Sequence, residues 1–254
     1  FYMGYGVTLY TTHTLYGSFL KPVNYKMNPS TLEIGAIKSL YKYDPGFVYN
    51  KGTQKRHFTY VFGETRSNII LNSSYISCGY LTPVEDFMLP TWQHTTNYYY
   101  NTVPLWQTIN DGNWNFIEKF IRKFAMENKL DLVITTGIFE NLSMEDDDGY
   151  TQELFMVPFQ ELLPIPKYIW KHVFNPKDKS CIVFIVHNNP FSEIPLSLCS
   201  NICKEYGWPD DLTDSKKGAM TCCSYENIKE IIKFMPETEC KVILRNDIID
   251  LLVN

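Results

Sequence analysis

The sequence predicts a mixed α+β fold, and three observations support this prediction. Aromatic residues make up 15% of the 254 residues, with 18 tyrosines and 16 phenylalanines, which favours several strands over a helical bundle. Apolar runs bounded by turn residues recur along the chain, and two stretches repeat apolar residues at helical spacing. With 44% hydrophobic residues and no repeat or low-complexity linker, we expect 1–254 to form one domain.

The first part of the chain reads as strands and loops. Residues 6–10 and 57–62 are rich in β-favouring side chains, and Pro, Gly and Asn separate such stretches. Helical periodicity is absent from residues 1–66, so we expect no helix there.

The second part alternates helices and strands. Trp114, Ile117, Ile121 and Phe124 recur at helical spacing and predict a helix over 114–128. Apolar runs predict strands at 130–134, 154–157 and 181–186, the middle one an edge strand. A second amphipathic helix is expected over 224–235, with Ser224 as its N-cap.

Cysteines and sequons favour a secreted, extracellular protein. The seven cysteines lack the spacing of a zinc site, so disulfides are the better interpretation, with at least one thiol left over. Asn72 and Asn141 begin N-glycosylation sequons. No apolar run reaches the roughly 18 residues of a membrane span, and the first twenty residues do not resemble a signal peptide, so we expect a mature or trimmed chain.

The net charge of -5 is unevenly distributed. Residues 1–127 carry eleven basic and eight acidic side chains, whereas residues 128–254 carry twelve and twenty. A basic first half permits sequence-independent binding to DNA or RNA phosphates without requiring it.

The most informative stretch runs from residue 77 to residue 122. It contains the ordered motifs Ser77-Cys78-Gly79-Tyr80-Leu81-Thr82-Pro83, Asp86-Phe87, Asn101-Thr102-Val103-Pro104-Leu105, and Asn110-Asp111-Gly112-Asn113-Trp114 followed by Glu118 and Arg122. In order and spacing these motifs resemble the DNA/RNA non-specific endonucleases of the ββα-metal class, whose signature begins D-R-G-H-L-A-P. The resemblance implies central antiparallel sheets flanked by helices with a ββα-metal motif.

Blocks outside this stretch resemble the secreted arthropod branch of the same family. They lie at residues 10–17, 166–171, 187–190 and 206–209, so the resemblance covers nearly the whole chain.

The resemblance also implies a role for each site residue. Asn110 would be the Mg²⁺ ligand, with water in most other positions, and Glu118 would order metal-bound water. Arg122 would meet a phosphate oxygen, although without the motif Glu118 and Arg122 would read as an exposed ion pair on one helix turn. Lys55, Arg56 and Arg66 precede the catalytic hairpin and are the candidates for the substrate-binding position of the family, with Arg56 preferred. Asn101 is the remaining candidate for substrate binding.

The catalytic turn departs from the family signature. Tyr80 stands at the position of the histidine that acts as general base, Cys78 at that of a substrate arginine, and Ser77 at that of an aspartate. A tyrosine with a pKa near 10 is ionised in only about one molecule in a thousand at pH 7, so it is a poor base. Losing general-base catalysis costs about 10²- to 10⁴-fold in rate. Leu105 also replaces a glutamine of the signature.

Other polar residues are weaker candidates. His94 could act as a substitute base, but a structural histidine is the favoured interpretation. His187 is expected to end a strand and shape a turn. The acidic run at 146–148 lacks the spacing of an EF-hand loop, so a solvated loop is favoured over a Ca²⁺ site.

Three functions follow from these observations. The first is a secreted nuclease-like protein that is inactive or strongly impaired as an enzyme and acts by binding, with nucleic acid as the first candidate ligand. The second is a slow Mg²⁺-dependent DNA/RNA endonuclease. The third is a protein-binding or structural partner, possibly an oligomer or a companion of an active relative.

Overall fold

A mostly antiparallel sheet forms the centre of the computed structural model, which describes residues 6–19, 32–35, 43–194 and 196–246. Its strands lie in the order β1-β4-β9-β10-β11, and the short β12 pairs in parallel with β10. The strand bounds are β1 Tyr10–Tyr16, β4 Asp131–Asn141, β9 Pro166–Asn175, β10 Ser180–His187, β11 Met220–Cys223 and β12 Val242–Ile243.

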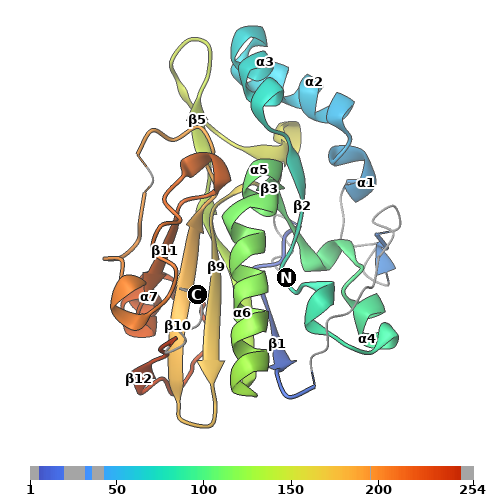
Figure 1. The fold of residues 1–254 in the computed structure, drawn as a ribbon. Helices are drawn as coiled ribbons and strands as arrows, with labels where there is room; N and C mark the ends of the chain where they lie inside the picture. Colours follow the sequence, from blue (N-terminus) through green and yellow to red (C-terminus); the bar gives the residue numbers. More distant parts are fainter. Residues whose placement is uncertain (1–5, 20–31, 36–42, 195, 247–254) are drawn as a thin grey trace.

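Helices cover the two faces of this sheet. On one face α6 (Asn115–Asn128) packs Ile117, Ile121 and Phe124 into the larger core. On the other, α7 (Tyr225–Ile231) packs Tyr225 and Ile228 into a second core. Strand β10 supplies alternate side chains to the two cores, as a strand buried on both faces must. Figure 1 shows α6 running along the sheet beside β9, with α7 at the left.

A two-stranded hairpin precedes α6. It consists of β2 (Ile76–Tyr80) and β3 (Thr102–Trp106), and Tyr80 lies opposite Thr102 in the antiparallel register. The chain then passes through the turns α5 (Gln107–Ile109) and η5 (Asn110–Trp114) directly into α6. Two strands followed by a helix form the expected ββα unit, and the mixed α+β fold class is confirmed.

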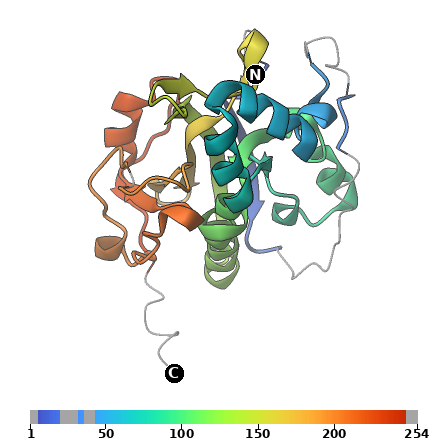
Figure 2. The same cartoon turned by 90° about the horizontal axis from the view of Figure 1, so that it is seen from above.

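The remaining helices and small sheets surround this centre (Figures 1 and 2). The other helices are α1 Pro45–Val48, α2 Lys51–Phe62, α3 Glu64–Ser73 and α4 Pro90–Thr95. The small sheets pair β5 Ser143–Glu145 with β6 Thr151–Glu153, and β7 Phe155–Val157 with β8 Leu162–Pro164. Single helical turns are η3 Val84–Asp86, η4 Tyr99–Asn101, η6 Pro158–Gln160, η7 Lys204–Tyr206 and η8 Ser215–Lys217.

The expectation of no helix within residues 1–66 is wrong, because α1 and α2 lie there and α3 begins at Glu64. The expected strand at 57–62 is wrong too, because these residues form the second half of α2. Asn50 caps this helix by accepting a hydrogen bond from the Gly52 amide at 2.8 Å. Gln54, Phe58 and Phe62 follow at intervals of four and are all buried. Burial of these three side chains against the rest of the protein favours the helix more than the β propensity of the individual residues disfavours it.

Other sequence-based boundaries need smaller changes. Only Tyr10 of the expected strand at 6–10 belongs to β1, which continues to Tyr16. Helix α6 and strands β4 and β10 are confirmed, whereas the strand at 154–157 belongs to a separate two-stranded sheet. Ser224 caps α7 by accepting from the Asn227 amide at 3.3 Å, but that helix ends at Ile231.

Six of the seven cysteines form disulfides, so the preference for disulfides over zinc is confirmed. The pairs are Cys181–Cys240, Cys199–Cys223 and Cys203–Cys222, and Cys78 is the leftover thiol. In the part of the chain that the structure describes, no helix is both long and apolar enough to cross a membrane.

Candidate nuclease-like site

The end of β2 presents the three residues of the altered catalytic turn. Ser77, Cys78 and Tyr80 are all half-buried, and Gly79 lies between them against the Leu105 side chain. A Cβ at Gly79 would come within 2.3 Å of Leu105, so only glycine allows this close packing of the hairpin. Leu105 itself is fully buried in the core, so its change from the signature affects packing and not the open side of the turn.

Burial makes both Tyr80 and Cys78 weak acids. It raises the pKa of the Tyr80 phenol to about 12, with smaller contributions from Cys78 and Glu85. Burial likewise raises the pKa of the Cys78 thiol to about 12, although hydrogen bonds to Tyr49 and Thr102 act in the opposite direction. At neutral pH both groups are protonated, so neither a phenolate base nor a thiolate nucleophile is available in appreciable amount.

Asn110 lies beside this turn because η5 begins next to β2. Its Nδ2 donates a hydrogen bond to the Ser77 Oγ at 3.2 Å. Within the described residues the Asn110 Oδ1 accepts no hydrogen bond from the protein, so this oxygen is left for an outside partner. An amide oxygen is a ligand that hard cations such as Mg²⁺ accept.

Among the described residues there is no group of three or more His, Cys, Asp or Glu side chains that could enclose a metal ion. The Asn110 amide oxygen has the chemistry of a direct ligand, and its role as the Mg²⁺ ligand stays a prediction from the motif.

Glu118 lies in a buried polar network on the next turns of α6 and is not an exposed helix residue. Its Oε1 is 3.7 Å from the Lys171 Nζ, and the two side chains are 12% and 2% exposed. Burial raises the pKa of Glu118 to about 7, even though the charges of Lys171 and Arg122 oppose this shift. Glu118 is therefore only partly ionised at neutral pH.

Lys171 comes from the centre of β9 and is held from three directions. Besides Glu118, its Nζ donates to the Thr136 Oγ1 at 2.6 Å and lies 4.8 Å from the centre of the Trp114 ring. Burial lowers the pKa of Lys171, although the charge of Glu118 opposes this. The ammonium is thus fully engaged inside the protein.

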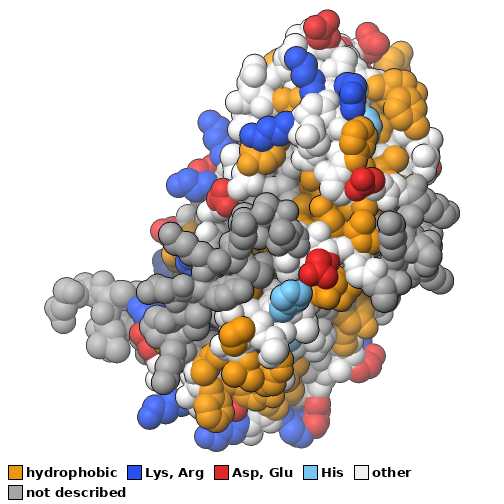
Figure 3. All heavy atoms as spheres, turned by 90° about the vertical axis from the view of Figure 1, so that its right-hand side faces the viewer, with side chains coloured by type: hydrophobic (Ala, Val, Ile, Leu, Met, Phe, Trp, Pro, Cys, Tyr) orange, Lys and Arg blue, Asp and Glu red, His pale blue; other side chains and the backbone are white. Residues whose placement is uncertain are grey.

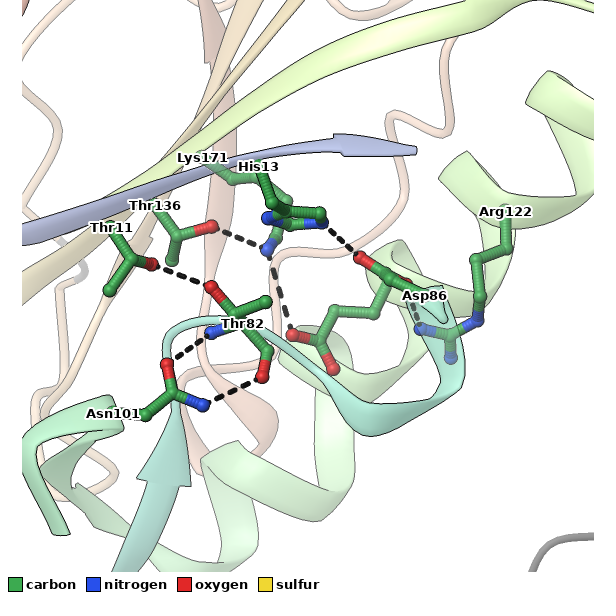
Figure 4. A network of polar contacts seen from close by, with 9 residues as sticks. Thr11, His13, Thr82, Asp86, Asn101, Arg122, Thr136 and Lys171 are labelled. Carbon is green, nitrogen blue, oxygen red and sulfur yellow. Dashed lines mark hydrogen bonds and ion pairs between the residues drawn. The ribbon is translucent and has the colours of Figure 1, made fainter. Parts of the chain in front are cut away.

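Arg122 pairs with Asp86 and not with Glu118. Its Nη1 lies 2.9 Å from the Asp86 Oδ1, and the His13 Nε2 lies 2.8 Å from the other carboxylate oxygen. Burial alone would raise the pKa of Asp86, but the hydrogen bond and charge of His13, together with the Arg122 charge, lower it. Figure 4 shows these side chains converging from β1, η3 and α6. The interpretation of Glu118 and Arg122 as an exposed ion pair is therefore wrong.

Asn101 holds the hairpin in shape. Its Nδ2 donates to the carbonyls of Thr82 and Thr96, each at 2.9 Å, and its Oδ1 accepts from the Thr82 amide at 3.0 Å. The side chain is 4% exposed, and its two amide hydrogens and its amide oxygen are all engaged inside the protein. This geometry assigns Asn101 a positioning role for the turn after Tyr80.

Arg56 lies on the exposed side of α2, away from this network. Its guanidinium is 5.8 Å from the centre of the Phe47 ring, and its Nη2 is 3.4 Å from the Thr53 Oγ1. Among the described residues, no hydrogen bond or ion pair joins it to Tyr80, Asn110 or Glu118.

The weaker candidates have structural surroundings. His94 is 63% exposed and lies 3.6 Å from the Glu33 carboxylate. His187 ends β10 and is buried, which lowers its pKa to about 4. In the acidic loop, Asp147 accepts hydrogen bonds from the Thr65 and Arg66 amides at the start of α3, so it serves as a cap contributed from a distant loop.

An apolar pocket of about 310 Å³ adjoins the Asp86 end of the network. Its lining residues are Tyr16, Phe19, Asp86, Phe87, Met88, Leu89 and Trp92. Figure 3 shows hydrophobic side chains gathered at the lower part, in the middle and at the upper right of this face, with Lys and Arg side chains at its upper part and along its lower edge. The charged residue of this lining is the carboxylate Asp86, which repels phosphate, so the pocket does not suit a polyanion.

Sequence reasoning assigned no role to Lys171, His13 or Asp86, although all three lay within motifs it noted. The signal for Lys171 was an ammonium in the middle of the mostly aromatic and apolar run 168–174, which indicates either an edge position or a buried ion pair. The partners of His13 and Asp86 lie 73 and 36 residues away along the chain, so no local pattern could identify them.

Known proteins resemble this chain along most of its length. The family model for DNA/RNA non-specific endonucleases matches residues 3–234. A salivary endonuclease of Lutzomyia longipalpis is 30% identical over 178 residues, which are 68% of this chain and 43% of the relative. The salivary protein Tsal1 of Glossina morsitans morsitans is 27% identical over 222 residues, covering 85% of this chain and 55% of the relative. The chain thus spans about half the length of these two relatives.

A solved structure has the same fold. A chain in the crystal structure of the EndoG/EndoGI complex matches 91% of this chain and 78% of its own length, with a TM-score of 0.52 and 14% identity. The relatives are salivary proteins of arthropods, and they confirm the resemblance that the motifs indicated.

Proposed function

Since the chain belongs to the DNA/RNA non-specific endonuclease family, we propose that it binds nucleic acid but cuts it poorly or not at all. The observation that carries this proposal is Tyr80 at the end of β2, where the family motif has its general base. With a pKa of about 12, the phenol is ionised in only about one molecule in 10⁵ at pH 7. A general base must be unprotonated to accept a proton, so this position contributes little to cutting.

Mg²⁺ binding is part of the proposal, with Asn110 as the direct ligand. The support is the Asn110 amide oxygen, which accepts no hydrogen bond from the described residues, and the general dependence of this family on metals. A bound Mg²⁺ would stabilise negative charge on phosphate oxygens. Ser77 orients the amide, and Asn101 fixes the turn that carries Tyr80.

We also infer that the protein acts outside the cell. Three disulfides favour an oxidising compartment, and the relatives described above are salivary proteins.

The test combines a cleavage assay with a binding assay on the purified chain. Supercoiled plasmid and double-stranded RNA incubated with Mg²⁺ should stay intact, whereas labelled duplexes should bind at 0.05 M salt, where electrostatic affinity is high. Turnover close to that of an active family member would overturn the proposal, and so would absence of binding at that salt concentration.

A slow metal-dependent endonuclease is the second candidate, favoured by the open amide oxygen of Asn110. The Asn110→Ala variant separates this activity from contamination. Trace cleavage that disappears in this variant belongs to the chain, and cleavage that persists unchanged comes from a contaminating nuclease.

A further inference from the structure

A short basic turn rests directly on the start of the site helix. It is η8, whose last two residues are Lys216 and Lys217. A Cβ on Gly112 would lie 2.6 Å from the Lys217 carbonyl oxygen and 3.0 Å from its Cα, so the two backbones are in close contact. Gly112 is two residues from Asn110, which places this turn at the edge of the candidate metal position.

Hydrogen bonds fix the turn in this place. The Asn113 Nδ2 donates to the Gly218 carbonyl at 2.7 Å and to the Leu212 carbonyl at 3.3 Å. Asp214 caps η8 by accepting from the Lys216 amide at 2.9 Å. The backbone that carries the two lysines is therefore pre-organised, which reduces the entropy lost when their side chains bind a ligand.

The two lysines differ from the other cations of the site in being available. Both are exposed, and in the described ranges neither lies within ion-pair distance of a carboxylate. Lys171, by contrast, is buried and already paired with Glu118, and the partly buried Arg122 is paired with Asp86. An external polyanion can therefore bind the η8 lysines without breaking an ion pair inside the protein.

A groove of about 680 Å³ extends from this turn towards α3. Arg66 and Lys216 lie along it, together with the apolar side chains of Ile69 and Phe191. The Arg66 Nε is buried and has no hydrogen-bond partner among the described residues. Two carboxylates also line the groove, namely Asp214, which is used as the cap, and the exposed Glu193.

We propose that Lys216, Lys217 and Arg66 form a phosphate-binding edge that holds the sugar-phosphate backbone of nucleic acid beside Asn110. This edge supplies the positive charge that Cys78 cannot. Contacts to phosphates fix position and carry no sequence information, so the edge binds DNA and RNA alike. The inference rests on the proposed nucleic-acid binding and names the residues that provide it.

The experiment measures binding of labelled 20-base-pair DNA and RNA duplexes by fluorescence anisotropy from 0.05 to 0.3 M NaCl, with EDTA present. For K216Q/K217Q we expect at least a tenfold loss of affinity at 0.05 M salt. Because each lost phosphate contact on a DNA duplex lowers the slope of log K against log salt by about 0.9, this slope should fall by roughly 1.8. Adding R66Q should lower it by about a further 0.9.

The matched control is K233Q/K241Q, which removes the same charge from exposed lysines paired with Glu230 and Glu239. It should leave affinity and slope within twofold of the wild type. If the wild type binds and K216Q/K217Q keeps its affinity and slope, the assignment of phosphate binding to this edge is wrong. The proposed binding of nucleic acid is then still supported. If the wild type itself does not bind at 0.05 M salt, the proposed function fails.

Discussion

Tyr80 is the residue on which the absence of efficient cutting depends. Restoring the signature with Tyr80→His, Cys78→Arg and Ser77→Asp should raise Mg²⁺-dependent plasmid cleavage by about 10²- to 10⁴-fold, because an imidazole is largely unprotonated near pH 7. Agarose-gel kinetics on supercoiled plasmid measure this change. The gain should disappear when Asn110→Ala is added.

Tyr80→Phe serves as the matched control for this series. It removes only the phenol oxygen, so any trace of cleavage should remain if Tyr80 is not a base. Loss of that trace in the phenylalanine variant would assign the base role to the tyrosine and favour the slow-enzyme alternative.

Glu118 makes the free energy of unfolding depend on pH, and the Glu118→Gln substitution isolates this contribution. Its pKa rises from 4.5 to about 7 on folding, so between these pH values the folded state keeps a proton that the unfolded state releases. The free energy of unfolding therefore falls as pH rises through this window, by up to about 3 kcal/mol. Glu118→Gln cannot titrate, so its stability relative to wild type should increase from pH 4.5 to 7.

Urea unfolding at several pH values measures this difference. The contribution of Asp86, whose lowered pKa stabilises the fold above its folded pKa, is common to both proteins and cancels. Glu127→Gln, on the exposed side of the same helix, should show no such trend. A flat difference for Glu118→Gln would mean that this carboxyl has an ordinary pKa.

At the scale of secondary-structure elements, Asp86 joins β1 to α6 through His13 and Arg122. Asp86→Ala should lower the free energy of unfolding by about 3 to 5 kcal/mol, because it leaves a buried guanidinium without its partner. Chemical denaturation measures this loss. Glu127→Ala, which breaks the exposed pair with Lys123 on the same helix, should cost less than about 1 kcal/mol. If Asp86→Ala and Glu127→Ala lowered the free energy of unfolding equally, the buried ion pair would contribute no more to stability than the exposed one.

The elements differ in how well the sequence predicts them. Helix α6 and strand β10 were predictable because their apolar spacing directly reflects the core that they bury. Helix α2 was not, because its Thr, Tyr, Val and Phe residues favour strands one by one. The spacing of Gln54, Phe58 and Phe62, together with Asn50 before them and Gly63 after, was the signal that could have indicated a helix.

At the scale of the whole molecule, the candidate site was only half predictable. Tyr80, Asn110 and Glu118 belong to one continuous motif, so their order in the sequence was enough to suggest a site. Lys171 and Lys217 reach it from β9 and η8, and only the folded topology reveals their proximity. For the same reason, the sequence suggested a free Arg122, whereas the fold pairs it with Asp86.

The disulfides separate the stability of the whole molecule from the proposed binding site. Cys181–Cys240 joins β10 to the segment before β12, closing a loop with a sequence separation of 59 residues. Its removal by Cys181→Ala and Cys240→Ser should lower the free energy of unfolding by about 2 to 4 kcal/mol, because the unfolded chain gains freedom. Figure 1 places β12 and α7 at the lower left, away from the β2–β3 hairpin and from α3, which carries Arg66, so nucleic-acid affinity should not change.

Cys78→Ser is the control for this double variant, since Cys78 forms no disulfide. It should leave all three disulfides intact, so that a thiol assay of the unfolded, unreduced variant finds no free thiol, whereas the wild type shows one. Denaturation midpoints and duplex affinity of both variants complete the comparison. A loss of affinity in the Cys181/Cys240 variant, measured under conditions where it remains folded, would show that the binding surface extends to the disulfide-linked end of the sheet.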